Sequence, residues 1–470
     1  MKRVILIILY ACTILLSVGA QQAKYIFYFI GDGMGCNQVN TTEMYMAELE
    51  GRIGRKQLLM TQLPFSGLAA TFSKSNSITC SSAAGTALAS GEKTNNGTLG
   101  LDDNGKRTHS IAEKLHEQGW GVGIMTSVSI DHATPGAFYA HVQKRNDYYT
   151  IGTQLAASGF DFFGGGTFYY PYPKKNYDYN NKSLYQQCRE QGYTFARGYD
   201  DYLAKKDSAK KMILIQEHEG LTDDYKGQGM IPYRIDRKEG DMSLVEITKA
   251  AIDFLSSRHD RFFMMVEGGA IDWACHSNDA AAAINDVIEF DEALRVAYDF
   301  YLHHKDETLI VVTADHETGG LALGNSDYTL NLQVLQNQKV SLSVLSDELQ
   351  TMRKQYGKRL KWQQVKQLFV DRLGLYEAVQ LDADEDAVLQ KQFKQMQKGK
   401  SGDVKTMYKQ VASLARAAVA LLDTKAHLGW TTGGHSASAV PVFAIGVGAE
   451  QFTGWQDNTE LAPKILNVVK

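Results

Sequence analysis

The sequence predicts an α/β protein: a large, mostly parallel central sheet with helices on both faces, and a helical insertion before the last core strand. Short apolar runs rich in β-branched and aromatic residues alternate with longer helical patterns, which is typical of parallel sheets. Between 325 and 428 this alternation gives way to helical sequence rich in Gln, Lys and Leu. The runs expected to form buried strands are Tyr25–Ile30, Gly121–Thr126, Met212–Ile215, Phe262–Val266, Leu309–Thr313 and Val442–Val447.

Helical patterns over Ser110–Glu117, Ser243–Ser256 and Asn278–His303 separate most of these strands. The chain is therefore expected to consist of an α/β core over 21–324, a helical insertion over 325–428 and a final core segment over 429–470. The insertion is expected to serve either as a crown over a site at the strand ends or as an interface.

Composition excludes several classes of protein. Of the 470 residues, 44% are hydrophobic and 22% are charged, which is ordinary for a globular chain and unlike a disordered or collagen-like one. The 49 basic and 53 acidic residues leave a net charge of −4, and no basic stretch is interleaved with aromatic residues. No nucleic-acid partner is therefore expected.

The first twenty residues have the pattern of a secretory signal peptide. Lys2 and Arg3 precede the apolar run 4–18, and small residues lead to a cleavage site after Ala20. A retained membrane anchor is the alternative, and lipid attachment at Cys12 is a weaker one. We expect export to the periplasm or the medium, without stable insertion in the membrane.

Four cysteines lie beyond this segment: Cys36, Cys80, Cys188 and Cys275. They have no CxxC spacing, which argues against a zinc finger or a thioredoxin motif. In an exported protein they could pair, and the sequence leaves their partners open.

Residues suited to metals and anions follow most of the predicted strands. In open parallel sheets, ligands bind beyond the carboxyl ends of the strands. Asp32 follows the first strand between two glycines, which let the backbone turn tightly around the carboxylate. Thr134 and Arg145 follow a later strand, where a hydroxyl suits a metal and a guanidinium suits a phosphate. Each motif alone also fits an ordinary turn.

Ser81 begins a run of small residues that predicts a helix. A serine at that position is either a helix cap or, because helix N-termini attract anions, a nucleophile for a phosphoryl group.

Two further strands also end in ligand-type residues. Glu267 ends one of them, and Asp272 and His276 follow with the i,i+4 spacing that places both on one face of a helix. Asp315 and His316 directly follow the other. One such pair is usually a surface contact, but a carboxylate-rich set with histidines at the strand ends favours a metal site.

His435 precedes the last predicted strand and completes the set. Mixed histidine and carboxylate ligands suit zinc, whereas carboxylates with a hydroxyl suit a harder ion such as magnesium. The sequence therefore predicts a centre with more than one metal ion.

Six motifs, in order, resemble those of the alkaline phosphatase family, and they extend over nearly the whole mature chain. They are IGDGMG, TCSSAAGTALASGEKT, DHATPGAF with the later Arg145, VEGGAIDWACH, TADHETGG and TGGH. The resemblance implies an exported hydrolase of phosphate monoesters that works through a phosphoserine on Ser81. It also implies two zinc ions and a third ion, usually magnesium, with Arg145 binding the phosphate.

The same resemblance implies the ligands of each ion. They are Asp272, His276 and His435 for one zinc, Asp32, Asp315 and His316 for the second zinc, which also faces the Ser81 oxygen, and Asp32, Thr134 and Glu267 for the third ion.

Three positions depart from the family pattern. Cys80 precedes Ser81 where the best-known members have Asp, so Arg145 is expected to rely on a different partner. His132 and Trp273 stand where one bacterial branch has Asp and Lys, and we expect them to tune magnesium retention and the contacts to phosphate. Although a second serine follows Ser81 directly, the ungapped alignment favours Ser81.

Two alternative functions remain at this point. The wider superfamily includes phosphodiesterases, sulfatases and cofactor-independent phosphoglycerate mutases. Arg145 favours a monoester, and the signal sequence argues against a cytoplasmic mutase. The other alternative is an exported phosphate- or metal-binding protein without turnover.

Small phosphomonoesters are the expected partners, with a homodimer as a further expectation because the family is commonly dimeric.

Overall fold

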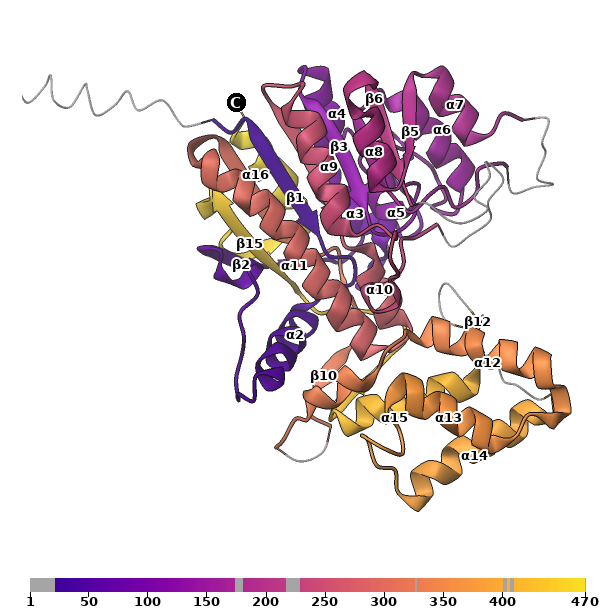
Figure 1. The fold of residues 1–470 in the computed structure, drawn as a ribbon. Helices are drawn as coiled ribbons and strands as arrows, with labels where there is room; N and C mark the ends of the chain where they lie inside the picture. Colours follow the sequence, from indigo (N-terminus) through magenta and orange to yellow (C-terminus); the bar gives the residue numbers. More distant parts are fainter. Residues whose placement is uncertain are drawn as a thin grey trace, which may run out of the picture.

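The computed structural model describes residues 22–173, 181–216, 229–325, 328–399, 404–405 and 410–469. Figure 1 shows a layered α/β body with a helical lobe at its lower right. The predicted signal peptide lies outside the described residues. Within them, no helix combines the length and the apolar character needed to cross a membrane.

A ten-stranded sheet, counted over the described residues, forms the centre of the molecule. Its spatial order is β16-β2-β15-β8-β1-β7-β3-β4-β6-β5. All neighbouring strands in it pair in parallel except those that contact β15, which is antiparallel to β2 and β8. In chain order, the strands are β1 (Tyr25–Ile30), β2 (Phe65–Ala70), β3 (Gly121–Thr126), β4 (Phe162–Gly165), β5 (Tyr193–Arg197), β6 (Lys211–Ile215), β7 (Phe262–Glu267), β8 (Thr308–Thr313), β15 (Val440–Gly446) and β16 (Gly454–Asp457).

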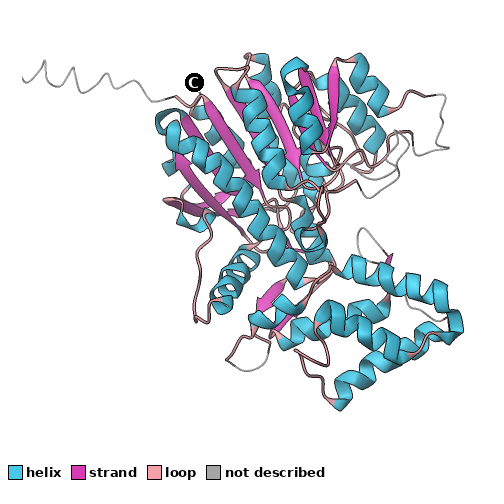
Figure 2. Cartoon of the chain, viewed as in Figure 1, coloured by secondary structure: helices cyan, strands magenta, loops and turns pink. Residues whose placement is uncertain are grey.

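Helices lie in front of this sheet and behind it (Figures 1 and 2), so the mostly parallel α/β fold predicted from the sequence is confirmed. The helices outside the lobe are α2 (Cys36–Leu49), α3 (Ser81–Ser90), α4 (Ile111–Glu117), α5 (Ala133–Gly136), α6 (Tyr148–Ser158), α7 (Leu184–Glu190), α8 (Tyr199–Lys205), α9 (Leu244–Ser256), α10 (Gly269–His276), α11 (Ala280–His303) and α16 (Leu461–Asn467).

Local sequence explains where the long helices begin. At the start of α9, the Ser243 side chain accepts a hydrogen bond from the backbone N–H of Glu246, and the Glu246 carboxylate accepts one from the backbone N–H of Ser243. At the start of α11, the side chain of Asp279 accepts from the backbone of Ala282. The helix predicted from Asn278 therefore begins at Ala280 instead, with Asp279 as its cap.

The strand register aligns the carboxyl ends of the central strands. Ile30, the last residue of β1, pairs with Glu267 of β7 on one side and with Thr313 of β8 on the other. Glu267 also pairs with Thr126 at the end of β3. Four neighbouring strands therefore end at one level, and whatever follows them is brought together there.

The helical lobe has its own apolar core, which is composed mainly of residues between 321 and 428. Its entry and exit are joined by an antiparallel pair, β10 (Leu321–Leu323) and β13 (Leu428–Trp430). The division into three segments and the role of the insertion as crown or interface stay predictions. The helices of the lobe are α12 (Leu342–Tyr356), α13 (Trp362–Leu373), α14 (Ala383–Gln397) and α15 (Ser413–Lys425), and its short strands are β11 (Val404–Lys405) and β12 (Gln410–Val411).

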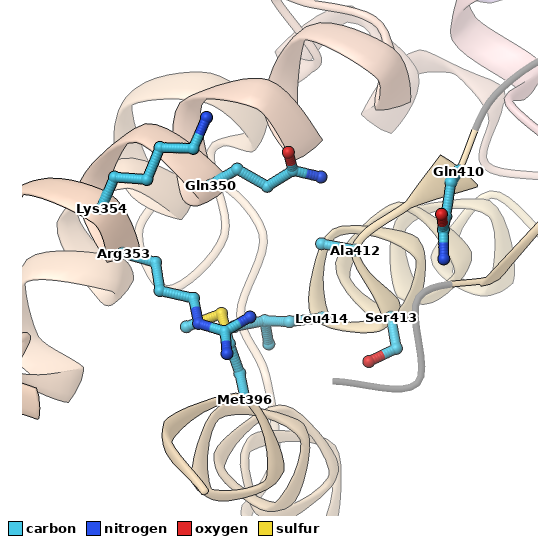
Figure 3. A pocket seen from close by; sticks show the side chains of 8 residues that line it. All are labelled: Gln350, Arg353, Lys354, Met396, Gln410, Ala412, Ser413 and Leu414. Carbon is cyan, nitrogen blue, oxygen red and sulfur yellow. The ribbon is translucent and has the colours of Figure 1, made fainter. Parts of the chain in front are cut away.

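A cavity of about 510 Å³ lies in this lobe, between residues of α12, α14 and the start of α15. Figure 3 shows its lining, which includes Arg353, Lys354 and Met396. None of the predicted metal ligands lines this cavity. The candidate active site therefore lies elsewhere, at the ends of the sheet strands.

Candidate active site

The aligned strand ends bring the predicted ligands into one buried cluster. Asp32 follows β1, Glu267 ends β7 and Asp315 follows β8, and all three carboxylates are fully buried. Two short elements complete the arrangement: α10 carries Asp272 and His276, and the pair β14 (His435–Ser436) with β9 (Glu317–Thr318) places His435 beside the segment after β8.

The turn after β1 requires a glycine at position 33. Gly33 has a φ of +71°, in the region that disfavours other residues. A Cβ atom there would lie 2.9 Å from both the Cα and Oδ1 of Asp272 and 2.9 Å from Oγ1 of Thr318. This close approach lets the turn that carries Asp32 pack directly against the helix that carries Asp272.

Asp272, His276 and His435 form the first group whose ligand atoms lie within 4.8 Å of one another. His276 Nε2 is 3.4 Å from Asp272 Oδ2 and 3.1 Å from His435 Nε2. The Nδ1 atoms face backbone carbonyls, at 2.7 Å for His276 and 2.8 Å for His435. With Nδ1 donating to a carbonyl, each ring presents the lone pair of Nε2 to the shared space, which is how histidine ligands are usually oriented.

Asp32, Asp272 and His316 form the second such group. His316 Nε2 is 3.5 Å from Asp32 Oδ1 and 3.2 Å from Asp315 Oδ2. Asp272 thus stands in this group where the resemblance implies Asp315, although Asp315 also contacts His316. The other oxygen of Asp315 accepts hydrogen bonds from the backbone of Gly33 and of His316, which fixes the carboxylate.

The third group is Asp32, His132 and Glu267. Thr134, which is implied as a ligand, donates to Asp32 Oδ2 at 3.3 Å and therefore lies in the same place. His132 Nδ1 is 3.8 Å from Glu267 Oε1. The first and second groups share Asp272, and the second and third share Asp32, so the three form one continuous centre.

Ser81 is the first residue of α3 and is fully buried. Its Oγ is 3.2 Å from His316 Nε2, which places it against the second group. The neighbouring Ser82 has its Oγ 3.1 Å from the Sγ of Cys80 instead. Of the two adjacent serines, Ser81 is the one in contact with a predicted metal ligand.

Arg145 is less buried than the cluster that it adjoins, since it is half-buried whereas most of the predicted ligands are fully buried. Its Nη2 is 3.3 Å from His132 Nε2. The ring of Trp273 packs edge-on against His132, with centroids 6.1 Å apart. His132 therefore contacts Arg145 with one nitrogen and approaches Glu267 with the other, so it joins the predicted phosphate-binding residue to the third group.

The electrostatics fit a site built for cations. Burial and the neighbouring carboxylates Asp315, Asp272 and Glu267 raise the pKa of Asp32 well above its ordinary value. Burial lowers the pKa of His316 well below its ordinary value, and repulsion by His435 adds to the effect. These shifts arise because burial disfavours the charged form of each group and because like charges nearby repel it.

The donor atoms also fit metal ions. Within the described residues, the buried oxygens Asp32 Oδ1, Glu267 Oε1 and Asp315 Oδ2 accept no hydrogen bond. Buried carboxylate oxygens are normally paired, so oxygens left open toward a shared space are suited to a cation.

Sequence reasoning missed two threonines that support this centre. Thr318 Oγ1 donates to Asp272 Oδ1 at 2.6 Å and lies 3.2 Å from His316 Nδ1, so it links the first two groups. Thr126 donates to Glu267. Thr318 lies inside the motif TADHETGG, so its polar side chain near two ligands was the signal that could have identified it.

The four cysteines within the described residues are free thiols.

Comparisons with known proteins agree on one family. The model of the family "Alkaline phosphatase" matches residues 23–470. Alkaline phosphatase 3 of Bacillus subtilis is 28% identical over 96% of this chain and 89% of its own length. The cold-active alkaline phosphatase of a psychrophilic Shewanella has a TM-score of 0.77 at 27% identity, covering 95% of this chain and 100% of its own.

A third relative concerns metal binding. It is a variant of the alkaline phosphatase from the Antarctic bacterium TAB5, solved with magnesium bound in its M3 site. It is 25% identical, with a TM-score of 0.62, and the match covers 96% of this chain and 99% of its own. Because the family model matches nearly the whole chain, we conclude that this protein is an enzyme of the alkaline phosphatase family.

Proposed function

We propose that the chain is an exported alkaline phosphatase that hydrolyses phosphate monoesters through a phosphoserine on Ser81. The observation that carries this proposal is the distance of 3.2 Å between Ser81 Oγ and His316 Nε2, at the edge of a buried cluster of ligand-type side chains. Ser81 also begins α3, where backbone N–H groups favour an anion.

The donor chemistry supports two zinc ions and one magnesium ion. Asp272, His276 and His435 would hold one zinc, Asp32, Asp315 and His316 the second zinc, and Asp32, Thr134 and Glu267 the magnesium. When bound, zinc supplies Lewis acidity that favours ionised hydroxyl groups and stabilises the entering and leaving oxygens of an in-line displacement.

Arg145 and Ser81 have different roles in the reaction. Arg145 binds two oxygens of the phosphoryl group with its guanidinium fork, which holds phosphorus in front of Ser81. Ser81 Oγ loses its proton to solvent and attacks phosphorus, and the ester P–O bond breaks as the Oγ–P bond forms. The organic group leaves as its alcohol after taking up a proton from water. Water then cleaves the Oγ–P bond, which releases inorganic phosphate and restores Ser81.

The assignment to monoesters rests on Arg145, because a monoester dianion carries one negative charge more than a diester for the guanidinium to attract. Export rests on the signal pattern in residues 1–20. Hydrolysis of diesters or sulfate esters, or binding without turnover, would make the chain a different member of the superfamily or a non-catalytic one.

Assays of the mature protein on a chromogenic phosphomonoester between about pH 6 and about pH 11 test this function. We expect hydrolysis that rises toward alkaline pH, disappears on chelation and returns with added zinc and magnesium. A metal-loaded protein that leaves the monoester intact would overturn the assignment, and a diester and a sulfate ester assayed in parallel would identify the alternative.

Substitution of the nucleophile separates Ser81 from its neighbour. Ser81→Ala removes the attacking oxygen, so we expect kcat to fall by at least about a thousandfold. Ser82→Ala is the matched control, since Ser82 Oγ faces Cys80, and should change kcat by less than about threefold. A larger loss in Ser82→Ala than in Ser81→Ala would reverse the assignment. Trapping of phosphate on the protein at acidic pH provides a second readout.

A further inference from the structure

Three tyrosines gather beside the predicted phosphate-binding arginine. Tyr148 begins α6, three residues after Arg145. Its ring centroid is 4.7 Å from that of Tyr169 and 5.7 Å from that of Tyr170. The rings of Tyr169 and Tyr170 are 4.7 Å apart and nearly perpendicular, at 86°. We call Tyr148, Tyr169 and Tyr170 the tyrosine cluster.

Two consecutive residues connect this cluster to the candidate active site. Asp131 is fully buried, and its carboxylate accepts from the backbone N–H of Tyr169 at 3.0 and 3.1 Å. The next residue, His132, contacts the Arg145 guanidinium at 3.3 Å. The turn between β3 and α5 thus fixes both Tyr169 and Arg145. The charge of Arg145 also acts on the Tyr148 hydroxyl, whose pKa burial raises to about 12 and Arg145 lowers in part.

The tyrosines share the partial burial of the residues at the edge of the site. Ser81, Asp32 and His316 are fully buried, whereas Arg145 and His435 are half-buried. The organic part of a bound ester must therefore extend past these half-buried residues. The three tyrosines are also half-buried, unlike Tyr202, which is fully buried in the core.

We propose that Tyr148 and Tyr169 form an aromatic subsite that receives a planar ring on the organic group of the phosphomonoester. This inference rests on the proposed function and names a substrate class for it: esters that carry an aromatic or heteroaromatic ring. Arg145 fixes the phosphoryl group, and the ring packs on the tyrosines by offset or edge-to-face stacking. Fixed tyrosine rings lose little conformational entropy when a ligand packs on them.

Two substrates of equal intrinsic reactivity test the subsite. AMP and the primary phosphate of glycerol are both phosphates of primary alcohols, but AMP alone carries a planar base. In Tyr148→Leu and Tyr169→Leu we expect the ratio of kcat/KM for AMP to that for glycerol phosphate to fall by about tenfold, which is the size of base–aromatic stacking effects. Tyr148→Phe and Tyr169→Phe keep the ring and should keep the wild-type ratio.

Tyr149→Leu is the matched control on the same helix. The Tyr149 hydroxyl donates to the backbone of Lys182, on the side of α7, so its loss should leave the ratio unchanged. The inhibition constant of inorganic phosphate, which has no organic group, reports on the phosphate-binding residues alone. We expect it to stay within about twofold in both leucine variants.

The outcomes separate this inference from the proposed function. If the wild-type enzyme hydrolyses neither ester, the proposed function fails. If it hydrolyses both esters and the leucine variants lose kcat/KM equally on AMP and on glycerol phosphate, the tyrosines have a structural role and the subsite is wrong. The same conclusion follows if the leucine variants weaken phosphate inhibition as much as they lower kcat/KM for AMP. A fall in the ratio that the phenylalanine variants also show would overturn the stacking argument.

Discussion

Burial makes it costly for a carboxyl group beside the site to carry its negative charge. Asp131 is the clearest case in the described chain, because it accepts two contacts from one backbone N–H and lies outside the predicted metal ligands. Burial raises its pKa from the ordinary 3.8 to about 7, even though hydrogen bonds from Tyr169 and its neighbours lower it. The protonated carboxyl is therefore the form that the folded chain favours.

This shift predicts how stability depends on pH. Because the folded pKa lies above the unfolded one, the contribution of Asp131 is fully present below about pH 4 and is lost as pH rises toward about 7. Asp131→Asn does not titrate. From about pH 5 to about pH 8, we expect the free energy of unfolding of the wild type, relative to that of this variant, to fall by about 2 kcal/mol.

Urea unfolding of both metal-loaded proteins across that range measures the difference. Titration of the metal ligands affects both proteins equally and cancels. Asp200→Asn, at an exposed position on α8, is the control and should track the wild type at every pH. A wild-type-minus-Asp131→Asn difference that is constant or rises with pH would contradict the prediction.

At the scale of elements, the turn after β1 decides whether the centre can form. Gly33→Ala combines an unfavourable φ with a Cβ atom 2.9 Å from the backbone of Asp272. Gly51→Ala, at the end of α2, is the matched control, since its φ of +70° is nearly the same and its Cβ would meet nothing within 4 Å. The comparison therefore separates backbone strain from the clash.

We expect both variants to lose about 1 kcal/mol of stability from the positive φ. Gly33→Ala should in addition bind zinc at least about tenfold more weakly, because the clash separates Asp32 from Asp272. Zinc titration monitored by calorimetry, together with kcat on a phosphomonoester, measures the effect. Equal zinc affinity in the two variants would show that the close approach is unnecessary.

The sequence predicted some elements better than others, for a physical reason. The runs that form β1, β3, β7 and β8 are continuous and apolar because these strands are buried on both faces. Four strands of the sheet were missed. β2 (FSGLAA) and β16 (GWQD) are partly exposed and have small or polar residues, whereas β4 (FFGG) and β5 (YTFAR) are short runs with glycines or polar residues. The pairing of β2 with β15 on one side and with β16 on the other depends on contacts distant in sequence, which no local pattern reveals.

The candidate site was predictable to the extent that its residues lie directly after strands. Asp32, Glu267 and Asp315 meet because a parallel sheet aligns the ends of its strands, so their proximity followed from the fold class. The contact of His132 with Arg145 and the link through Thr318 did not, because both depend on side-chain directions in loops or very short elements. The tyrosine cluster lay outside every motif and was found only in three dimensions.

At the scale of the whole molecule, the metal centre joins segments from nearly the full length of the chain. Asp32 lies near the N-terminus and His435 near the C-terminus, and β1, β7, β8, α10 and β14 all supply or flank ligands. Without cations, burial and the repulsion of neighbouring carboxylates raise the pKa values of Asp32 and Asp315 well above the ordinary value, so ionising these two groups costs free energy. Bound metal should therefore stabilise the entire fold rather than one loop.

We accordingly expect chelation to lower the free energy of unfolding by about 3 kcal/mol or more, the linkage expected for an ion held at about a hundred times its Kd. Thermal unfolding of the wild type with and without chelator measures this. His435→Ala removes one ligand, so its metal-loaded form should be less stable and the drop on chelation smaller, while its metal-free form should match the metal-free wild type. Chelation that leaves the melting temperature of the wild type unchanged would mean that the cluster does not hold metal in the folded protein. That result would also contradict the proposed metal-dependent reaction.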